Sequence, residues 1–415
     1  MINLTGGTPQ IIEPVYNPFY FIGTSSNISQ PNFRFVMDVY TASSINLSSQ
    51  SFITRYRILP RPGANNFVFS PARALENYHS SDLYLDNYTV SSALTIGYNL
   101  TGGTSGTTQV LSAYVVKFGE EYGLTSTGTT IYSGLSGFTG YSLNAVRQYT
   151  DVQNWNYLEY VNLGSTSKFL TNRPSEIYIK NSTDRDILSI LRVQTSRMRV
   201  TTYQNSGSTR SFILSGIPAN NQHFHYGTGV WNLNNYSATT AGTFTIVNLN
   251  TDYKYTCQLI DFNSSPNELS EIKTYLIDDR SCKYETIRLI FLNRLGGWDG
   301  INFNLVSRRT INPTRTTYKK VLPYNYVVGM RGTSILDIDT TETKTITSDW
   351  FNDNESTWIE ELFTSPEVYE QQSDGTILPI IINTSSIEIK KSINDKLFNY
   401  SLDYTMAHNK YSQRG

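Results

Sequence analysis

The sequence predicts a mainly β protein made of tandem β-sandwich modules, similar in kind to immunoglobulin or fibronectin domains, with a few short helices. Charged residues make up only 16% of the 415 residues, whereas 30 tyrosines and 19 phenylalanines are present. Aromatic and β-branched side chains pack well on pleated sheets, and the strong helix formers are sparse. Short apolar runs with two-residue periodicity, bounded by turn residues, recur along the chain, as expected for half-buried strands.

The first predicted module spans residues 1–118, about the usual size of a β-sandwich. Its predicted strands are Asn17–Ile22, Phe33–Tyr40, Phe52–Leu59 and Tyr114–Phe118. In the second of these runs, alternate residues from Phe33 to Val39 are apolar, so one face of the strand is buried. Pro71–Tyr78 is a candidate short helix that Ser70 can cap, with Pro71 at the tolerated first position.

Residues 119–165 form a long excursion rich in Gly, Ser, Thr and Tyr. Connections longer than about fifteen residues are usually functional or disordered. The interleaved apolar side chains suggest a segment that orders against a partner and is mobile in the free subunit. The alternative is an irregular loop packed on its own domain, and the sequence leaves both open.

A second β module is predicted over residues 166–278, with a hairpin turn at Gln204–Gly207. Its predicted strands are Phe169–Leu170, Ile187–Leu191, Met198–Tyr203, Ser211–Leu214, Phe244–Leu249 and Tyr253–Ile260.

A C-terminal β domain with a packed helix is predicted over residues 279–415. Its most informative stretch is Phe291–Phe303, in which Gly296, Gly297 and Gly300 allow a sharp turn between two strands and Trp298 folds back onto a sheet face. A phosphate-binding loop would need a helix after the glycines, and the pattern there is strand-like. Further predicted strands are Tyr318–Leu322, Tyr324–Val328, Leu378–Ile382, Ser386–Lys390 and Lys396–Tyr404.

The clearest helix is predicted at Glu355–Thr364. Trp358, Leu362 and Phe363 share its apolar stripe, whereas Glu355, Glu360 and Glu361 point mostly outward. We therefore expect the tryptophan face to anchor the C-terminal sheet.

Composition limits the classes of function. The 33 basic and 34 acidic side chains are balanced, which argues against sequence-specific nucleic-acid binding or an anionic membrane surface. No apolar run approaches the roughly twenty residues that span a membrane, and no secretory signal is recognisable. Cys257 and Cys282 are expected to be buried free thiols, because two cysteines form no disulfide framework.

Several polar clusters contain residue types that occur in catalytic or metal sites. His223 and His225 lie on one strand face at a metal-compatible spacing, but no nearby Cys or acidic pair completes a site, so a solvated or subunit-contact pair is expected. Calcium binding needs more oxygens than the carboxylate pairs offer; these pairs are Asp337 with Asp339 and Asp278 with Asp279.

Nucleophilic chemistry also lacks a motif. Ser281 and Cys282 stand outside any strand-turn-helix context, and Lys117, Glu120 and Glu121 form a charge cluster of ordinary surface type. The sequence therefore predicts no catalytic, cofactor-binding or metal-ligating residue, no cofactor and no enzyme activity.

Five motifs resemble virion structural proteins of tailed phages of Bacteroidetes, crAss-like phages included. They span most of the chain: Phe33–Tyr40 after Asn17–Pro18, Lys117–Tyr122, Phe169–Pro174, Phe291–Asp299 and Trp358–Tyr369. The resemblance implies a non-enzymatic β-sandwich component of the tail or neck, of connector or baseplate type, that assembles as a ring. It implies that the protein folds in the host bacterial cytoplasm and is built into the virion.

The expected partners are copies of the chain and other tail, neck or portal-proximal proteins, without membrane insertion. Two other classes stay open. A receptor-binding or fibre-type attachment protein would present a distal face rich in exposed Trp and Tyr; no coiled-coil heptads are seen. A tail-borne glycan hydrolase would need coupled carboxylates in a cleft.

Overall fold

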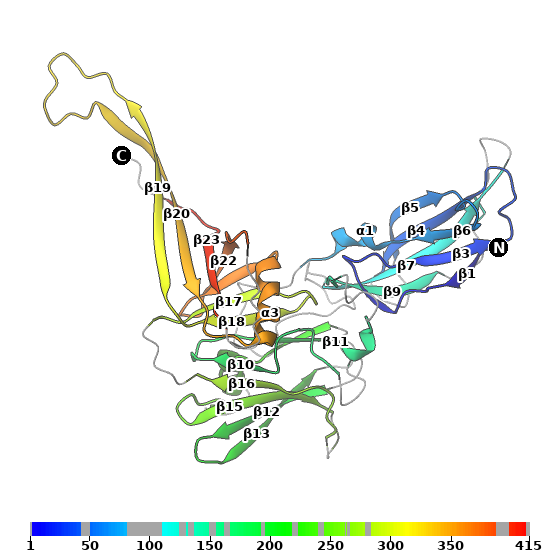
Figure 1. The fold of residues 1–415 in the computed structure, drawn as a ribbon, viewed down its shortest axis with the longest axis horizontal. Coiled ribbons are helices and arrows are strands. Elements are labelled where there is room, and N and C mark those ends of the chain that lie inside the picture. Colours follow the sequence, from blue (N-terminus) through cyan, green and yellow to red (C-terminus); the bar gives the residue numbers. More distant parts are fainter. Residues whose placement is uncertain are drawn as a thin grey trace.

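The computed structural model confirms the predicted fold class: the protein is mainly β, with several sheets and few short helices. Figure 1 shows three β-rich parts and one long hairpin that projects from the body. The structure describes residues 2–42, 50–80, 110–123, 130–131, 137–148, 155–161, 167–191, 196–217, 223–239, 245–261, 263, 266–278, 284–386 and 398–411.

The N-terminal module consists of two sheets that share one aromatic core. The larger sheet has the order β2-β9-β7-β4-β5, with β8 beside β7. Its strands are β2 (Ile12–Pro14), β4 (Arg34–Ala42), β5 (Gln50–Ile58), β7 (Leu111–Glu121), β8 (Thr130–Ile131) and β9 (Phe138–Leu143). The smaller sheet consists of β1 (Ile2–Gly6), β3 (Phe21–Ser25) and β6 (Asn66–Phe69). Rings from both sheets meet where Phe21 and Phe67 pack against Phe118, as a sandwich core requires.

Part of the predicted excursion belongs to this module. β9 pairs with β7 from Val116↔Phe138 to Leu111↔Leu143. Of the two alternatives for the excursion, packing on its own domain is therefore correct for Phe138–Leu143. The rest of the 124–136 stretch lies outside the described residues except for β8. The cap predicted at Ser70 is wrong: α1 (Ala72–Leu75) has Pro71 at its N-cap position and no side-chain cap, and the short 3₁₀ turn η1 (Glu76–Tyr78) follows.

The middle module has a five-stranded sheet of order β10-β16-β15-β12-β13 and a separate pair, β11 with β14. Its strands are β10 (Glu176–Ile179), β11 (Ile187–Leu191), β12 (Ser196–Gln204), β13 (Thr209–Ile217), β14 (His223–Gly227), β15 (Asp252–Ile260) and β16 (Lys273–Ile277). The predicted Gln204–Gly207 turn joins β12 to β13, with Gly207 at φ +83°. A 3₁₀ turn, η4 (Tyr157–Glu159), precedes the module.

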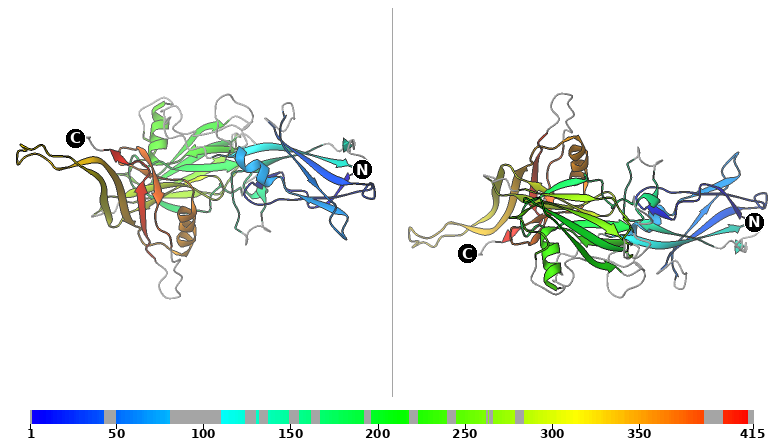
Figure 2. Two further views of the ribbon diagram at one scale, coloured as in Figure 1. Left: turned by 90° about the horizontal axis from the view of Figure 1, so that it is seen from above. Right: turned by 90° about the horizontal axis from the view of Figure 1, so that it is seen from below.

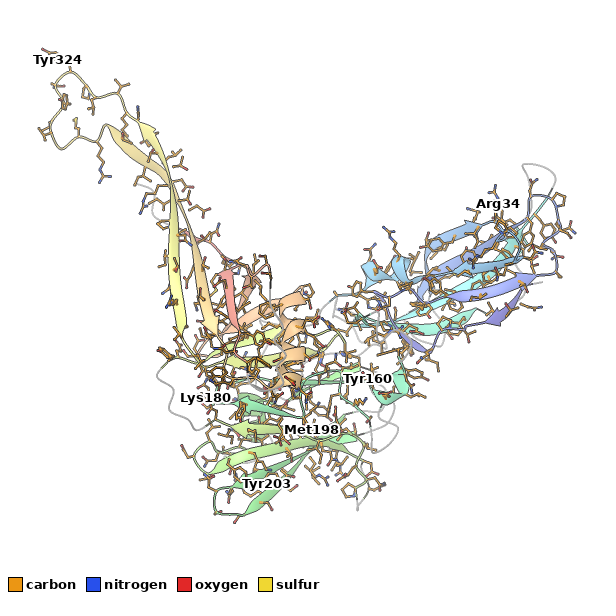
Figure 3. All side chains as sticks on the ribbon, viewed as in Figure 1. Arg34, Tyr160, Lys180, Met198, Tyr203 and Tyr324 are labelled. Carbon is orange, nitrogen blue, oxygen red and sulfur yellow. The ribbon has the colours of Figure 1, made fainter. Side chains whose placement is uncertain are left out.

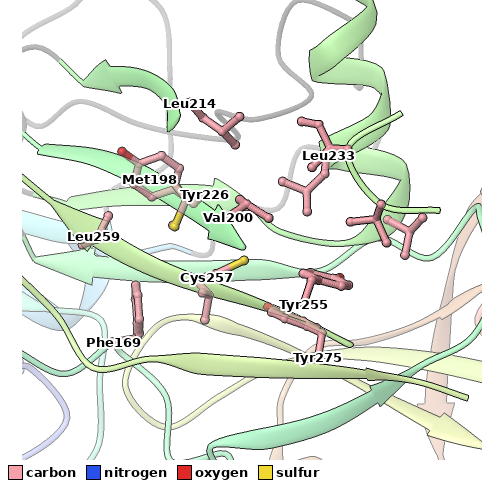
Figure 4. Packing of buried hydrophobic residues seen from close by; sticks show 14 of the residues in the cluster. Phe169, Met198, Val200, Leu214, Tyr226, Leu233, Tyr255, Cys257, Leu259 and Tyr275 are labelled. Atoms are coloured by element: carbon pink, nitrogen blue, oxygen red, sulfur yellow. The ribbon is translucent and has the colours of Figure 1, made fainter. Parts of the chain in front are cut away.

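The core of the middle module is apolar but includes buried tyrosines (Figure 4). Tyr255 and Tyr275 stack with ring centroids 4.7 Å apart. Cys257 is a buried free thiol, as predicted, whereas Cys282 lies outside the described residues. The sequence prediction missed α2 (Val230–Thr239). The strand predicted at Phe244–Leu249 is wrong over its described part, because Ile246 and Val247 enter the core from a loop.

The C-terminal module is one eight-stranded sheet covered by a helix. Its order is β18-β17-β21-β22-β23-β20-β19, with β24 beside β20. The strands are β17 (Ile287–Leu292), β18 (Trp298–Phe303), β19 (Ser307–Lys319), β20 (Thr333–Thr347), β21 (Val368–Gln371), β22 (Ile377–Ile382), β23 (Ser401–Met406) and β24 (Lys410–Tyr411). Of the strand predicted at Ser386–Lys390, residues 387–390 lie outside the described residues. Of the strand predicted at Lys396–Tyr404, residues 396–397 lie outside the described residues, and the described part becomes a strand at Ser401.

The predicted helix is confirmed as α3 (Asp353–Thr364). It begins two residues earlier than predicted because Asn352 caps it, and the Glu355 side chain accepts from the Asn352 backbone N–H in a capping box. Trp358 and Leu362 are buried in the C-terminal core, and Phe363 packs against them. The outward orientation predicted for Glu361 is wrong, since this residue is only 3% exposed.

Figure 2 shows that the N-terminal module and the projecting hairpin lie at opposite ends of an elongated molecule. An apolar cluster joins the parts: Ile12 and Leu143 of the N-terminal module pack with Leu170 and Leu191 of the middle module and with Leu295 of the C-terminal module. Among the described residues, no helix is long and apolar enough to cross a membrane.

Candidate functional site

The predicted histidine pair is buried rather than solvated. His223 and His225 lie on β14, each 1% exposed, with ring centroids 4.5 Å apart. The Nδ1 atom of His225 is 2.6 Å from the Ser189 hydroxyl on the paired strand β11. Among the described residues, no group of three or more His, Cys, Asp or Glu side chains is placed to hold a metal. The expected solvated or subunit-contact role is therefore wrong, because both rings are buried within the subunit.

The other candidate residues are dispersed. Asp337 and Asp339 lie on the projecting β20, whereas Asp278 is buried and 3.6 Å from the Lys180 ammonium. Residues 279, 281 and 282 lie outside the described part of the chain. The surface position predicted for the cluster of Lys117, Glu120 and Glu121 is wrong for Glu120. This residue is 1% exposed and accepts hydrogen bonds from Ser25 and Asn27, each at 2.8 Å.

The glycine corner at Phe291–Phe303 is architectural, as predicted, and it builds the junction between the middle and C-terminal modules. A strand, β18, follows the glycines. Only Gly296 of the three has a positive φ, at +79°. Gly300 instead lets the Arg288 guanidinium lie close to the backbone, because a Cβ at this position would be 2.2 Å from that group. Trp298 is 1% exposed and packs with Ile187 of the middle module.

The junction contains a buried ionic network centred on Asp186, which we call the junction network. One carboxylate oxygen of Asp186 accepts from Arg173 and from the Tyr275 hydroxyl, both at 2.6 Å, and the other accepts from Arg288 at 2.8 Å. Asp186, Arg173 and Arg288 are at most 3% exposed. Arg288 belongs to β17 and the other three residues to the middle module, so the network crosses the junction. Burial opposes charge on Arg173, but the carboxylate of Asp186 raises the pKa of its guanidinium.

A second buried carboxylate extends the network to α3. Asp299 accepts from the Thr171 hydroxyl at 2.8 Å and from the Trp358 indole N–H at 2.9 Å. Burial raises the pKa of Asp299, and the nearby Arg173 opposes that shift. Glu361 adds another cross-junction contact, because it accepts from the Asn172 amide at 2.7 Å. Sequence reasoning missed this network; the one available signal was that Thr171, Asn172 and Arg173 are polar residues directly after an apolar pair.

The second unusual feature is the projecting hairpin, residues 307–347, which we call the arm. β19 and β20 pair along its full length, from Ser307↔Ile346 to Lys319↔Thr333. β20 also pairs with β23 and β24 near the body, and this pairing ends at Asp339. From Asp339 toward the loop, the arm is therefore a ribbon of two strands. Thirteen residues of β19, at about 3.4 Å each, give a length of roughly 44 Å. Nearly every β19 residue is exposed.

The loop at the end of the arm, residues 320–332, is apolar and exposed, and we call it the tip. Figure 3 shows Tyr324 at its far end, with side chains along both faces of the ribbon. Val321, Tyr324 and Val328 are about fully exposed. Tyr326, Val327 and Met330 of the tip are also exposed, as is Leu336 on β20. The strand predicted at Tyr318–Leu322 is confirmed only for Tyr318 and Lys319, which end β19. The strand predicted at Tyr324–Val328 is wrong, because these residues lie in the loop that connects the two strands of the hairpin.

Carboxylates at the base of the arm are held by cations. Glu342 accepts from the Arg309 guanidinium at 2.5 Å and 2.9 Å. Glu370 accepts from Lys344 at 2.6 Å and from the Tyr404 hydroxyl at 2.7 Å. These contacts fix β19 and β20 to each other and to β21 and β23. Glu342 and Glu370 line a pocket at the arm base, and both are engaged in structural ion pairs.

No protein-family model and no curated protein matches the chain. Among solved structures, it is similar to the calcium-binding domain CBD12 of CALX1.1, with 10% identity, a TM-score of 0.19, and coverage of 62% of this chain and 78% of that chain. A tetra-tandem repeat in the extending region of a large adhesion protein has 8% identity, a TM-score of 0.20, and coverage of 98% and 89%. Likenesses at these TM-scores carry no argument about function.

Proposed function

We propose that this chain is a non-enzymatic structural component of a phage virion, a tail or neck protein that assembles with copies of itself in a ring. The observation that carries the proposal is the arm. A two-stranded ribbon is marginally stable in water by itself, and a contiguous exposed apolar surface usually marks an interaction site. The arm therefore requires a partner outside its own subunit.

The junction network supports a structural role. Three charged side chains are removed from water to connect the middle and C-terminal modules. Breaking such a network is costly, so the body behaves as one unit. A rigid body with a projecting arm suits permanent assembly, because obligate interfaces are large and symmetric.

The carboxylates support the same class of function. A glycan hydrolase needs two carboxyl groups that face a substrate. Asp186 and Asp299 are instead buried among arginine, tyrosine, threonine and tryptophan donors. Glu342 and Glu370 hold the base of the arm.

Host attachment is the second candidate, and the exposed rings of Tyr324 and Tyr326 favour it. Under the first proposal these rings are buried by another subunit of the virion. Under the second they stay exposed to solvent at the end of the particle. The partners proposed for the ring are copies of the chain and adjoining tail, neck or portal-proximal proteins, and the site of residence is the virion.

Mass measurement tests the proposal. The purified protein should form a species of defined multiple mass, and the same copy number should be found in purified particles. A matched variant replaces the tip, residues 320–332, by Asn-Gly, a sequence suited to a two-residue hairpin turn. It should keep the fold and lose the assembly. A wild-type protein that stays monomeric at every concentration, and a truncated arm without effect on mass, would each contradict the proposal.

A further inference from the structure

Charge is divided unevenly between the arm and the segment that follows it. Residues 307–347 contain seven basic and three acidic side chains, whereas residues 348–386 contain eight acidic side chains and none that is basic. The second segment includes α3, β21 and β22. Opposite charges on two surfaces of one molecule favour head-to-tail contact between copies.

Three of the seven basic side chains of the arm lie at its apolar end. Lys319 precedes the tip, and Lys320 and Arg331 lie near its two ends. Within the described part of the chain, none of these three cations has an ion pair with a carboxylate, whereas Arg309 and Lys344 at the base are paired. The tip therefore combines exposed aromatic area with unneutralised positive charge.

The acidic segment offers one surface with the complementary composition. Trp350, which lies shortly before the N-cap Asn352 of α3, is 57% exposed, while Trp155, Trp298 and Trp358 are buried. Asp349 accepts from the Trp350 backbone N–H at 2.8 Å, and Asp353 is exposed in the first turn of α3. We call Asp349, Trp350 and Asp353 the Trp350 face.

Three other acids of the segment have partners or positions away from this face. Glu360 pairs with Arg294 at 2.7 Å, and Glu370 pairs with Lys344. Glu361 is buried at the junction. The Trp350 face is thus where an exposed aromatic side chain and surface carboxylates coincide.

Resting on the proposed function, we propose that the tip of one copy docks on the Trp350 face of the next copy. Tyr324 and its apolar neighbours cover the Trp350 ring, and Lys319, Lys320 and Arg331 face the two aspartates. Figure 1 shows the tip pointing away from its own α3, so the contact joins different copies. Such a contact is heterologous, and it closes into a ring when the rotation between copies permits.

The available area suits this contact. A stable interface needs about 800 Å² per partner, and aromatic side chains bury roughly 150–250 Å² each. Two tyrosines, the adjoining valines and Met330 supply much of that area, and the two-stranded ribbon supplies more. Aromatic residues in the centre and charges at the rim are the usual arrangement of a specific interface.

A charge swap tests the proposal on the full-length protein. The tip variant is K319E/K320E/R331E, the face variant is D349K/D353K, and the third protein carries both sets. Each set alone should weaken association at least about tenfold in mass photometry at low salt, since like charges then face each other. The doubly changed protein should recover to within about threefold of wild type. E176K, an exposed substitution on β10, is the matched control and should leave assembly unchanged.

Trp350 gives an independent measurement, because Asp349 also contacts the local backbone and its replacement can disturb the helix start. Trp350→Ala removes a central aromatic side chain and should weaken association at least about tenfold with an unchanged melting temperature. In wild type, acrylamide quenching of tryptophan fluorescence should fall on assembly, and in Trp350→Phe this change should disappear.

The outcomes separate the two proposals. If the tip variant and the Asn-Gly arm prevent assembly but the face variant and Trp350→Ala do not, docking on the Trp350 face is wrong and the proposed function stands. If none of the arm variants changes the mass, the proposed function fails as well. Flotation of the wild type, but not the tip variant, with vesicles of anionic phospholipid would overturn the docking in favour of a lipid partner.

Discussion

Replacing Asp186 by Asn should uncouple the middle and C-terminal modules. The substitution keeps the size of the side chain but removes the one anion shared by Arg173 and Arg288. Both guanidinium groups are at most 3% exposed, so water cannot replace the lost charge. The Tyr275 hydroxyl also donates to the same carboxylate at 2.6 Å.

The expected cost follows from this burial. Breaking a buried ion pair by removing one partner costs about 3–5 kcal/mol. For cooperative units of 150–250 residues, 1 kcal/mol shifts the melting temperature by roughly 2–4 °C, so the loss should be roughly 6–20 °C. Differential scanning calorimetry of the full chain at neutral pH measures it. Because Arg288 comes from β17 and Asp186 from the middle module, the transition should also separate into two.

Asp374→Asn is the matched control. Asp374 is exposed in the turn between β21 and β22, where substitutions usually change stability by less than about 0.5 kcal/mol. An Asp186→Asn protein that melts like this control, in one unchanged transition, would refute the reasoning that the network couples the modules.

Three further changes test the packing. Trp358→Ala should cost about 3–5 kcal/mol through lost burial and a cavity, measured by denaturant unfolding; an unchanged midpoint would place the helix face elsewhere. Gly300→Ala should lower the melting temperature, because its Cβ would lie 2.2 Å from Arg288 at the junction. The control Gly329→Ala in the tip places its Cβ where no atom lies within 4 Å, so it should leave the melting temperature unchanged. Equal effects of the two substitutions would contradict the account. Burial raises the pKa of Glu361 above its ordinary 4.5, so this residue contributes stability below pH 4.5 that is lost as pH rises through the folded pKa. Between pH 4 and 7, the melting temperature of Glu361→Gln should therefore fall less with rising pH than that of wild type. Parallel pH profiles for the two proteins would contradict this prediction.

Local patterns were sufficient to predict much of the fold. Alternation in Phe33–Tyr40 identified β4, and the stripe of Trp358 and Leu362 identified α3. The glycine corner predicted the β17–β18 hairpin and the buried Trp298. These features depend on residues close in sequence, so periodicity and turn chemistry reveal them.

The arm and the junction network could not be predicted in this way. β19 is rich in Thr and Arg and is exposed on both faces, so it has no apolar alternation to detect. The network joins Asp186 to Arg288 across 102 positions, and no local pattern specifies such a pairing. The prediction for Glu361 failed for the same reason. Its position on the helix indicated a solvent-facing side chain, but Asn172 of the middle module donates a hydrogen bond to it.

Cryo-electron microscopy of the phage particles in which we propose that this chain resides tests the central claim most directly. The proposal predicts a closed ring of copies in the tail or neck, with each tip covered by the adjoining copy. A reconstruction in which the chain is an isolated, flexible monomer with its arm in solvent, or in which it is absent from the particle, would contradict the proposal.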